Sequence, residues 1–461
     1  MTHVKVCSHR KLLSSPLVIT AIAILLREGF ILILRLSSKQ VFFGEMASVG
    51  RALTAGQGFS WPCPIPTGPT ALVPPVYPFL VAAAFKSLGE YSDRSAAILL
   101  LLNSLFSGLV CLVLVAVGRR TVGTKAAILG AWAWALWPMA LWESHRIWES
   151  SLSVLLFTVV FLSVLIMQEK SGAVFGALCG LLWGVAALTN PAVLAFVIPA
   201  AFFETLRRKV AWSTLPAAPA VALLIMCVTV SPWIIRNYLV FHRIIPIRDG
   251  LPLELYLGNR ALASGENVLA AQPCVSRNEN RKMAQIGETQ YLQLKEQQAK
   301  TFIMAHPLEF CTRATRRAFY FWVSTPESWL DVGGSKRALF EKVMKIRRPL
   351  YALSSILALI GLLIAWHHRR SWLIFFAILL IVPPLPYYLT HGENRYRHPI
   401  EPEIMLLAAY TIVAVTRARH QTSQSVPTIF RQPSGAAEDR EGSMMPENSV
   451  RGCGSNHLRD A

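Results

Sequence analysis

The chain has 461 residues, of which 53% are hydrophobic and only 15% are charged, and its mean hydropathy is +0.43. A soluble chain carries about 25% charged residues and no long apolar runs, so this composition excludes an ordinary soluble protein. Much of the net charge of +19 lies in short clusters between apolar runs. That distribution is typical of a multipass membrane protein and does not indicate nucleic-acid binding.

Apolar runs of about 18 to 25 residues recur along the chain, which is the length that crosses a bilayer as a helix. Inside a bilayer such runs can only be helices, because every backbone N–H and C=O group must be bonded within the segment. We therefore expect an all-α multipass membrane protein with about ten transmembrane helices. The predicted spans are 13–36, 93–118, 126–142, 149–167, 172–190, 191–204, 212–235, 349–366, 372–390 and 402–416.

Basic residues that flank the predicted spans indicate the orientation of the chain. Lysine and arginine are retained on the cytoplasmic side, so ten spans place both termini in the cytoplasm. The residues that support this orientation are Lys5, Arg10, Lys11, Arg119, Arg120, Lys125, Lys170, Arg207, Arg208, Lys209, Arg369, Arg370, Arg417 and Arg419.

Two outer segments are too long to be simple turns. The first, 37–92, contains Glu45, an expected amphipathic helix that ends at Leu53, and a short apolar helix, 76–89, that we expect to lie in the membrane interface. The second, 236–348, is polar and is predicted to be extracytoplasmic.

The composition divides the chain into four predicted parts. Within the outer segment before residue 349, residues 282–323 are predicted to be helical. After residue 420 the chain is rich in Ser, Gly, Pro and charge, so we expect a disordered cytoplasmic tail. The parts are an N-terminal transmembrane module, 1–235; the extracytoplasmic segment, 236–348; C-terminal transmembrane helices, 349–417; and the tail, 418–461.

The eight cysteines are scattered without CxxC spacing, and Cys111, Cys179 and Cys227 lie inside predicted spans. We therefore expect small core residues, with neither a disulfide framework nor a cysteine metal site. No HxxxH or DxD pattern stands in an outer segment, so the sequence leaves metal dependence open.

Several segments follow one another in a recognisable order. GEMASVGRALTAGQGFS is followed by TGPTALVPPVYPFLVAAAFKSLG and IWESSLSVLLF, and then by GLLWGVAALTNPAVL, SPWIIRNYLVF and ENRYRHPIEPEIMLLAAY. Over residues 41–412 this order resembles the bacterial branch of glycosyltransferase family 39, which is related to the dolichyl-phosphate-mannose–protein mannosyltransferases and the lipid A aminoarabinose transferase. The resemblance implies a GT-C fold and a polyprenyl-phosphate-linked sugar donor. It also implies inverting transfer at the outer face of the bacterial inner membrane, to a lipid, glycan or protein acceptor.

The resemblance points to two catalytic acids, Glu45 and Glu149. Such a reaction needs a base for the acceptor and cationic or metal help for the leaving phosphate. Glu45 matches the family's first-loop acid, often an aspartate, and is the expected general base; the alternative is that it only caps an interfacial helix. Glu149 matches the second outer acid, and it either orients the acceptor, shares a divalent metal with Glu45, or complements a helix dipole. Glu143 is the alternative candidate for this second acid.

Arginines in outer turns are the candidates for binding the phosphate. Arg395 and Arg397 stand in HGENRYRHP, and arginine forms paired hydrogen bonds to phosphate oxygens; snorkelling to headgroups is the alternative. Arg236 and Asn237 in PWIIRN form a second candidate pair, with a helix-end role as the alternative. Tyr77 in PPVYP and Tyr396 beside the arginines complete the expected substrate-binding residues.

Two other classes of protein compete with the transferase. A transporter or flippase would carry ionisable groups or broken helices near mid-membrane, and the predicted span interiors are nearly free of charge apart from Arg27 and Glu28. A non-catalytic membrane scaffold is the third class. The acids and arginines on one predicted face favour the transferase.

Overall fold

The computed structural model describes residues 12–34, 38–42, 44–170, 172–207, 217–261, 271–325 and 337–424. By their internal contacts, residues 1–416 and 417–461 form two units. The second contributes only the end of α20 (Glu401–Gln424) to the described part. The predicted tail from residue 425 onward, and the basic residues Lys5, Arg10, Lys11, Arg208 and Lys209, lie outside the described residues. The boundaries at 235 and 348 stay predictions.

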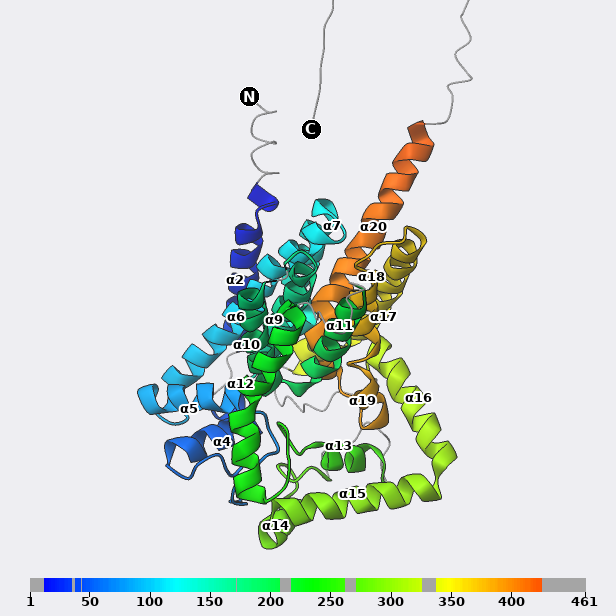
Figure 1. Ribbon diagram of the computed structural model, residues 1–461. Helices are drawn as coiled ribbons and strands as arrows, with labels where there is room; N and C mark the ends of the chain where they lie inside the picture. The colour runs from blue at the N-terminus through cyan, green and yellow to red at the C-terminus, as the bar shows by residue number, and fades with distance from the viewer. Residues whose placement is uncertain are drawn as a thin grey trace, which may run out of the picture. The chain divides into compact units, whose positions relative to one another are not determined.

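The first unit is a bundle of helices, and the described part of the chain contains no strand (Figure 1). Three shorter apolar helices, Val76–Leu88, Ala173–Thr189 and Leu373–Leu389, accompany the longer ones. This is the all-α multipass architecture of a membrane protein, as the sequence predicts. In the described ranges, six segments are long and apolar enough to cross a membrane: Pro16–Leu34, Asp93–Arg120, Ser150–Met167, Ala218–Phe241, Lys345–His367 and Asn394–Arg419.

Prolines divide two of the predicted spans into shorter helices. The span predicted at 126–142 consists of α7 (Thr124–Ala135) and α8 (Pro138–Ser144). The span predicted at 372–390 consists of α18 (Leu373–Ile381) and α19 (Leu385–Leu389), with Pro383 and Pro384 between them. Proline cannot donate a backbone hydrogen bond and clashes with the preceding turn, so each helix ends before it.

Most of the remaining helices of the bundle agree with the predicted spans to within about six residues, but α17 begins at Arg337, twelve residues before the span predicted from 349. The span predicted at 191–204 is a short 3₁₀ turn (Pro191–Val193) that leads into α11. The bounds are α2 Pro16–Leu34, α6 Asp93–Arg120, α9 Ser150–Met167, α10 Ala173–Thr189, α11 Leu194–Arg207, α12 Ala217–Phe241 and α17 Arg337–His367.

Arg27 supports the break between α7 and α8. Its side chain is fully buried, and it donates hydrogen bonds to the carbonyl oxygens of Trp134 (3.3 Å) and Ala135 (3.2 Å), at the end of α7. Its Nε atom also donates to Ser107 Oγ at 2.7 Å. Carbonyl groups at a helix end lack partners within the helix, so this buried arginine has a structural role.

Helices α10 and α12 pack at unusually short range. Gly176, Gly180 and Gly184 form a stripe on α10, and a Cβ atom on Gly176 would lie 2.5 Å from the carbonyl oxygen of Ala218 on α12. A Cβ atom on Gly180 would lie 2.4 Å from the carbonyl oxygen of Ala222. Small residues four positions apart allow membrane helices to approach this closely.

The outer segments fold into helices at one end of the bundle (Figure 1). The first contains α4 (Glu45–Thr54), which is the predicted amphipathic helix, and α5 (Val76–Leu88), which is the predicted apolar one. The region predicted to be helical at 282–323 is three helices, because Gly287 (φ +79°) and Pro307 interrupt it. The helices of the second outer segment are α13 Leu251–Gly258, α14 Arg277–Ile286, α15 Glu288–Ala305 and α16 Pro307–Val323.

Candidate functional site

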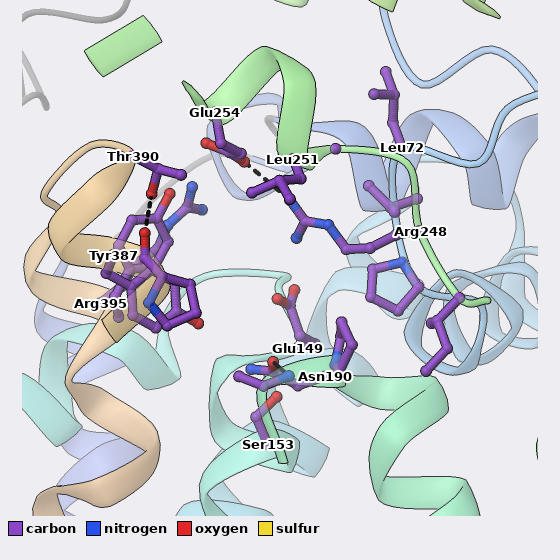
Figure 2. Close-up of a pocket in the computed structure, with 18 of the residues that line it drawn as sticks. Leu72, Glu149, Ser153, Asn190, Arg248, Leu251, Glu254, Tyr387, Thr390 and Arg395 are labelled. Carbon is purple, nitrogen blue, oxygen red and sulfur yellow. Dashed lines mark hydrogen bonds and ion pairs between the residues drawn. The ribbon is translucent and has the colours of Figure 1, made fainter. Parts of the chain in front are cut away.

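A cavity of about 430 Å³ lies where the outer helices meet the ends of the membrane helices. Glu45 of α4, Glu149 at the start of α9 and Arg395 before α20 all line it. Arg248 and Glu254, before and within α13, line the cavity on the side of α13 (Figure 2). Two acids that are 104 positions apart in the sequence (149 − 45) therefore share one cavity with two arginines.

Glu45 is the first residue of α4. It follows Gly44, whose φ of +125° is open to glycine but not to other residues. A Cβ atom on Gly44 would lie 2.8 Å from the ring of Trp148, so the chain passes close to the start of α9 here. The Oε1 atom of Glu45 accepts a hydrogen bond from Gln272 Nε2 at 3.1 Å. Burial raises the pKa of Glu45, while the backbone and Arg395 oppose that shift.

Glu149 precedes the first turn of α9, and its carbonyl oxygen accepts a hydrogen bond from Ser153 N at 2.7 Å. Figure 2 shows its side chain reaching from the end of the helix toward Arg248. The Oε2 atom is buried and has no hydrogen-bond partner among the described residues. Burial raises the pKa of Glu149 to about 7, and Arg395 opposes the rise. A carboxyl group with such a pKa can hold or release a proton near neutral pH.

The rival acid, Glu143, lies outside the cavity lining. It belongs to α8, is buried, and forms an ion pair with Arg146 at 3.8 Å. The geometry therefore favours Glu149 as the partner of Glu45.

Arg395 and Arg248 are the cationic groups that line the cavity. Arg395 forms an ion pair with Glu393, and its guanidinium lies 4.8 Å from the ring centre of Trp148. Arg248 donates to Glu254 Oε1 at 2.9 Å. Arg395 was predicted from the sequence, but Arg248 was not. Arg248 carries no local signal, because it is one arginine in a long predicted outer segment where the charge rule does not apply.

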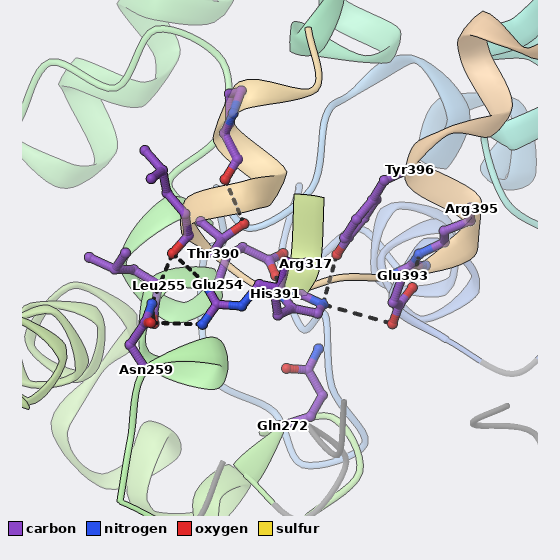
Figure 3. Close-up of polar contacts among 12 residues, drawn as sticks. Glu254, Leu255, Asn259, Gln272, Arg317, Thr390, His391, Glu393, Arg395 and Tyr396 are labelled. Carbon is purple, nitrogen blue, oxygen red and sulfur yellow. Dashed lines mark hydrogen bonds and ion pairs between the residues drawn. The ribbon is translucent and has the colours of Figure 1, made fainter. Parts of the chain in front are cut away.

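His391 connects the two sides of the cavity through a buried network (Figure 3). Its Nδ1 atom lies 2.9 Å from Glu254 Oε2, and its Nε2 atom lies 2.9 Å from the hydroxyl of Tyr396. Burial alone would lower the pKa of His391, but Glu254 and Glu393 outweigh it and raise the pKa to about 9. Burial opposes the shift of Glu254 as well, yet His391 and Arg248 lower its pKa to about 2. This network joins α13 to the turn that carries Arg395 and Tyr396.

Four of the predicted substrate-binding residues do not line the cavity. Arg397 is fully buried and donates to Trp322 O at 2.7 Å and to Ser354 Oγ at 2.7 Å, so its guanidinium serves the packing of the bundle. Tyr77 is buried and donates its hydroxyl hydrogen to Asn103 Oδ1 at 2.9 Å.

The other two, Arg236 and Asn237, are neighbours on α12, and each donates hydrogen bonds that hold a different loop in place. Arg236 donates to the carbonyl oxygens of Thr70 (2.9 Å) and Phe59 (2.8 Å). Asn237 is buried and donates to Ile245 O at 2.9 Å. Of the predicted substrate-binding residues, Arg395 and Tyr396 thus remain at the cavity.

The expectation of no disulfide was wrong. Cys63 of the first outer segment and Cys274 of the second form a disulfide across 211 positions of sequence. The spacing of the cysteines gave no signal for it, because a pairing over such a distance becomes visible only when the chain is folded. Cys274 also lines the cavity.

The donor set at the cavity does not fit a resident divalent metal well. Glu45 and Glu149 both line the cavity, and Arg395 opposes the rise that burial causes in the pKa of each. Among the described residues no group of three or more His, Cys, Asp or Glu side chains could hold a metal ion. A protein site for Mg²⁺ or Ca²⁺ needs several oxygen ligands around one point.

Comparison with known proteins gives a structural match and no sequence match. No family model matches the sequence, and no curated protein is similar to it. The structure is similar to the archaeal oligosaccharyltransferase AglB from Archaeoglobus fulgidus in complex with an inhibitory peptide and a dolichol-phosphate, with a TM-score of 0.54 and 14% identity. The match covers 91% of this chain and 52% of that one.

A second structure of that archaeal enzyme, tethered to an acceptor peptide by a disulfide bond, gives a TM-score of 0.52 at 14% identity, over 88% of this chain and 50% of that one. The chain thus spans about half the length of these enzymes. ArnT from Cupriavidus metallidurans bound to undecaprenyl phosphate aligns at a TM-score of 0.34 and 15% identity, over 84% and 76% of the two chains, which is too loose to add to the conclusion. The chain therefore has the all-α multipass GT-C fold that its sequence predicts.

Proposed function

We propose that the protein is a membrane glycosyltransferase. It moves a sugar from a polyprenyl-phosphate donor to an acceptor, with inversion at the anomeric carbon. The observation that carries the proposal is the convergence of Glu45, Glu149, Arg248 and Arg395 on one cavity at the end of a membrane bundle. A carboxylate pair beside a guanidinium pair suits a reaction that takes a proton from a nucleophile and releases a phosphate.

Glu45 is the general base in this proposal. The acceptor's oxygen or nitrogen attacks the anomeric carbon from the face opposite the phosphate, and its proton passes to the carboxylate of Glu45. The bond between the anomeric carbon and the phosphate oxygen breaks at the same time, and its electron pair leaves with the phosphate. Burial supports this role, because the raised pKa of Glu45 makes it a stronger base than an ordinary carboxylate.

Glu149 lies in the same cavity and orients the reacting sugar or the acceptor. Its Oε2 atom, which has no partner in the described part of the chain, can accept a hydrogen bond from a substrate hydroxyl. With a pKa of about 7, its carboxyl group can also donate one when it is protonated. No step of this mechanism needs a metal, because Arg248 and Arg395 in the same cavity supply positive charge for the leaving phosphate.

Arg248 and Arg395 bind the phosphate of the donor. Both line the cavity, and both are already held by a carboxylate, Glu254 and Glu393 respectively. Such pairs fix the guanidinium groups in position before the donor enters, which lowers the entropy that binding costs. Guanidinium groups also stabilise the charge that develops on the phosphate as it leaves.

The membrane fold supports a lipid-linked donor. The archaeal enzyme of similar fold is known with a bound dolichol-phosphate, and a donor of this kind brings its phosphate to the end of a helix bundle. The predicted orientation places this end at the outer face of the bacterial inner membrane, with both termini in the cytoplasm. The acceptor is a lipid, a glycan or a protein that reaches that face.

The test is transfer of radiolabelled sugar from polyprenyl-phosphate donors by the purified protein in detergent or vesicles. Wild-type protein should transfer label, and Glu45→Gln should lower kcat by about a hundredfold to ten-thousandfold, which is the usual contribution of a general base. The matched control is Glu90→Gln, an exposed acid that lies outside the cavity lining. Transfer at the wild-type rate by Glu45→Gln would remove the base assignment. The absence of transfer from every donor tested would refute the proposal.

A further inference from the structure

Gln272 is a polar residue of the cavity wall that the catalytic scheme above does not use. Its Nε2 atom donates to Glu45 Oε1 at 3.1 Å. Its Oε1 atom is buried and has no hydrogen-bond partner among the residues that the structure describes. Figure 3 places Gln272 near His391. The amide therefore contacts the expected base on one side and offers a hydrogen-bond acceptor on the other.

The backbone of Gln272 is held in a tight turn. Its carbonyl oxygen accepts hydrogen bonds from Val275 N (3.0 Å) and Ser276 N (2.8 Å). Cys274 lies inside this turn and is bonded to Cys63. A covalent link two residues from Gln272 therefore fixes the turn to the first outer segment, which also carries Glu45.

Noncovalent contacts around the disulfide join the same two segments. Ile65 N donates to Asn280 Oδ1 at 2.8 Å, and Ala71 N donates to Glu288 Oε1 at 2.7 Å. Cys63 is buried in an apolar cluster with Leu253 of α13. The disulfide is thus the covalent part of an interface that sets the position of the Gln272 turn relative to α4.

We infer that Gln272 is a positioning residue for the base Glu45, and that the Cys63–Cys274 disulfide holds it in place. The inference rests on the proposed function. The amide N–H of Gln272 donates a hydrogen bond to one carboxylate oxygen of Glu45, so the other oxygen is left to accept the proton of the acceptor. The free Oε1 atom of Gln272 accepts a hydrogen bond from a second polar group of the acceptor, such as a neighbouring hydroxyl.

A consequence is that full activity needs the oxidised protein. Reduction by a dithiol reagent such as dithiothreitol transfers two electrons to the disulfide, leaves Cys63 and Cys274 as thiols, and converts the reagent into its cyclic disulfide. The turn that carries Gln272 then loses its covalent link, and the carboxylate of Glu45 loses its fixed orientation. Oxidising conditions prevail outside the cytoplasm, which matches the predicted outer location of the site.

The first experiment measures kcat and KM separately for Gln272→Leu, with Gln290→Leu on the exposed face of α15 as the matched control. Loss of a hydrogen bond that orients a catalytic group should lower kcat by about tenfold to a hundredfold, with little change in the KM for the donor. The control should behave as wild type. An unchanged kcat, or a rise in the donor KM alone, would overturn the positioning role. Wild-type protein that transfers nothing refutes the proposed function and this inference with it.

The second experiment tests the disulfide. Wild type treated with dithiothreitol, and the double variant Cys63→Ser/Cys274→Ser without it, should lose kcat to the same extent as Gln272→Leu. Gln272→Leu itself should lose little more on reduction. The control is Cys311→Ser, which removes an exposed free cysteine. Full activity of the double variant, or alkylation of Cys63 and Cys274 in unreduced protein, would overturn the role of the disulfide whether or not the first experiment succeeds.

Discussion

Replacement of Gly258 by alanine should damage the site from a distance. Gly258 ends α13, and a Cβ atom there would lie 1.8 Å from the carbonyl oxygen of Thr390, which lines the cavity. Real Cβ atoms are essentially never closer than 3.0 Å to another atom, so the two backbones must separate by the difference of 1.2 Å. Arg317 bridges the same junction, because it donates to Gly258 O (2.8 Å) and to Leu389 O (3.0 Å). A separation of the two backbones would therefore stretch these hydrogen bonds.

The expected loss has two parts. Overpacking of a close contact costs about 1–3 kcal/mol of stability. A displacement of about 1 Å near a reacting group costs about a hundredfold in rate, and α13 also carries Glu254, the partner of Arg248 and His391. Gly258→Ala should therefore lower kcat/KM about a hundredfold in the sugar-transfer assay and lower the thermal midpoint in detergent.

The control for this prediction is Gly29→Ala in α2, where a Cβ atom meets nothing within 4 Å. Alanine in a helix interior is favoured over glycine by about 0.5–1 kcal/mol, so this variant should be active and at least as stable as wild type. Gly258→Ala with wild-type activity and thermal midpoint would refute the reasoning, because the close approach of α13 and Thr390 would then not exist.

Three further predictions concern the cavity. The Glu254–His391 ion pair should stabilise the fold fully between pH 4.5 and 6.5. Its effect should be lost as the pH rises through the His391 pKa of about 9 or falls through the Glu254 pKa of about 2. His391→Gln should therefore remove part of the fall in thermal midpoint between pH 6.5 and 9, and an unchanged dependence of the thermal midpoint on pH in this variant would contradict the pairing. Arg395→Lys should lower kcat/KM for the donor about tenfold to a hundredfold, because lysine offers neither paired hydrogen bonds nor the same stacking on Trp148; wild-type kinetics would exclude Arg395 from the phosphate site. Treatment with EDTA should leave the transfer rate unchanged, because Arg248 and Arg395 line the cavity with the two acids and can stabilise the leaving phosphate without a metal. A rate that EDTA lowers and that only Mg²⁺ or Mn²⁺ restores would contradict this.

The membrane helices could be predicted because the length and apolarity that a bilayer requires depend only on the residues of each segment. A bilayer demands long apolar helices, so α2, α6 and α9 could be identified by counting apolar residues. The amphipathic α4 was also found, since it begins at Glu45 and carries its apolar residues on one face. The break between α18 and α19 is caused by Pro383 and Pro384. A prediction from hydropathy alone does not take these prolines into account, so it gives one continuous span.

The candidate site could be predicted only where a residue matches the family that the sequence resembles or belongs to a type that suits the substrate. Glu45 and Glu149 were proposed because they match the two acids of that family, and Arg395 because an arginine in a predicted outer turn can form paired hydrogen bonds to phosphate. Arg397 has the same sequence signal as Arg395, two positions away, yet the turn directs one guanidinium into the cavity and buries the other against Ser354. Arg248, Gln272 and the Cys63–Cys274 pair carry no local signal, because only the folding of the second outer segment brings them to the site.

The glycine stripe on α10 has a mechanical consequence. Backbones in such close contact as those of α10 and α12 have no layer of side chains between them to deform, so the two helices must move together. Asn190 and Pro191, which line the cavity directly after α10, therefore form a stiff floor. Movements that widen the cavity for a bulky substrate are therefore expected on the opposite wall, where loops and short helices tolerate movement at low cost.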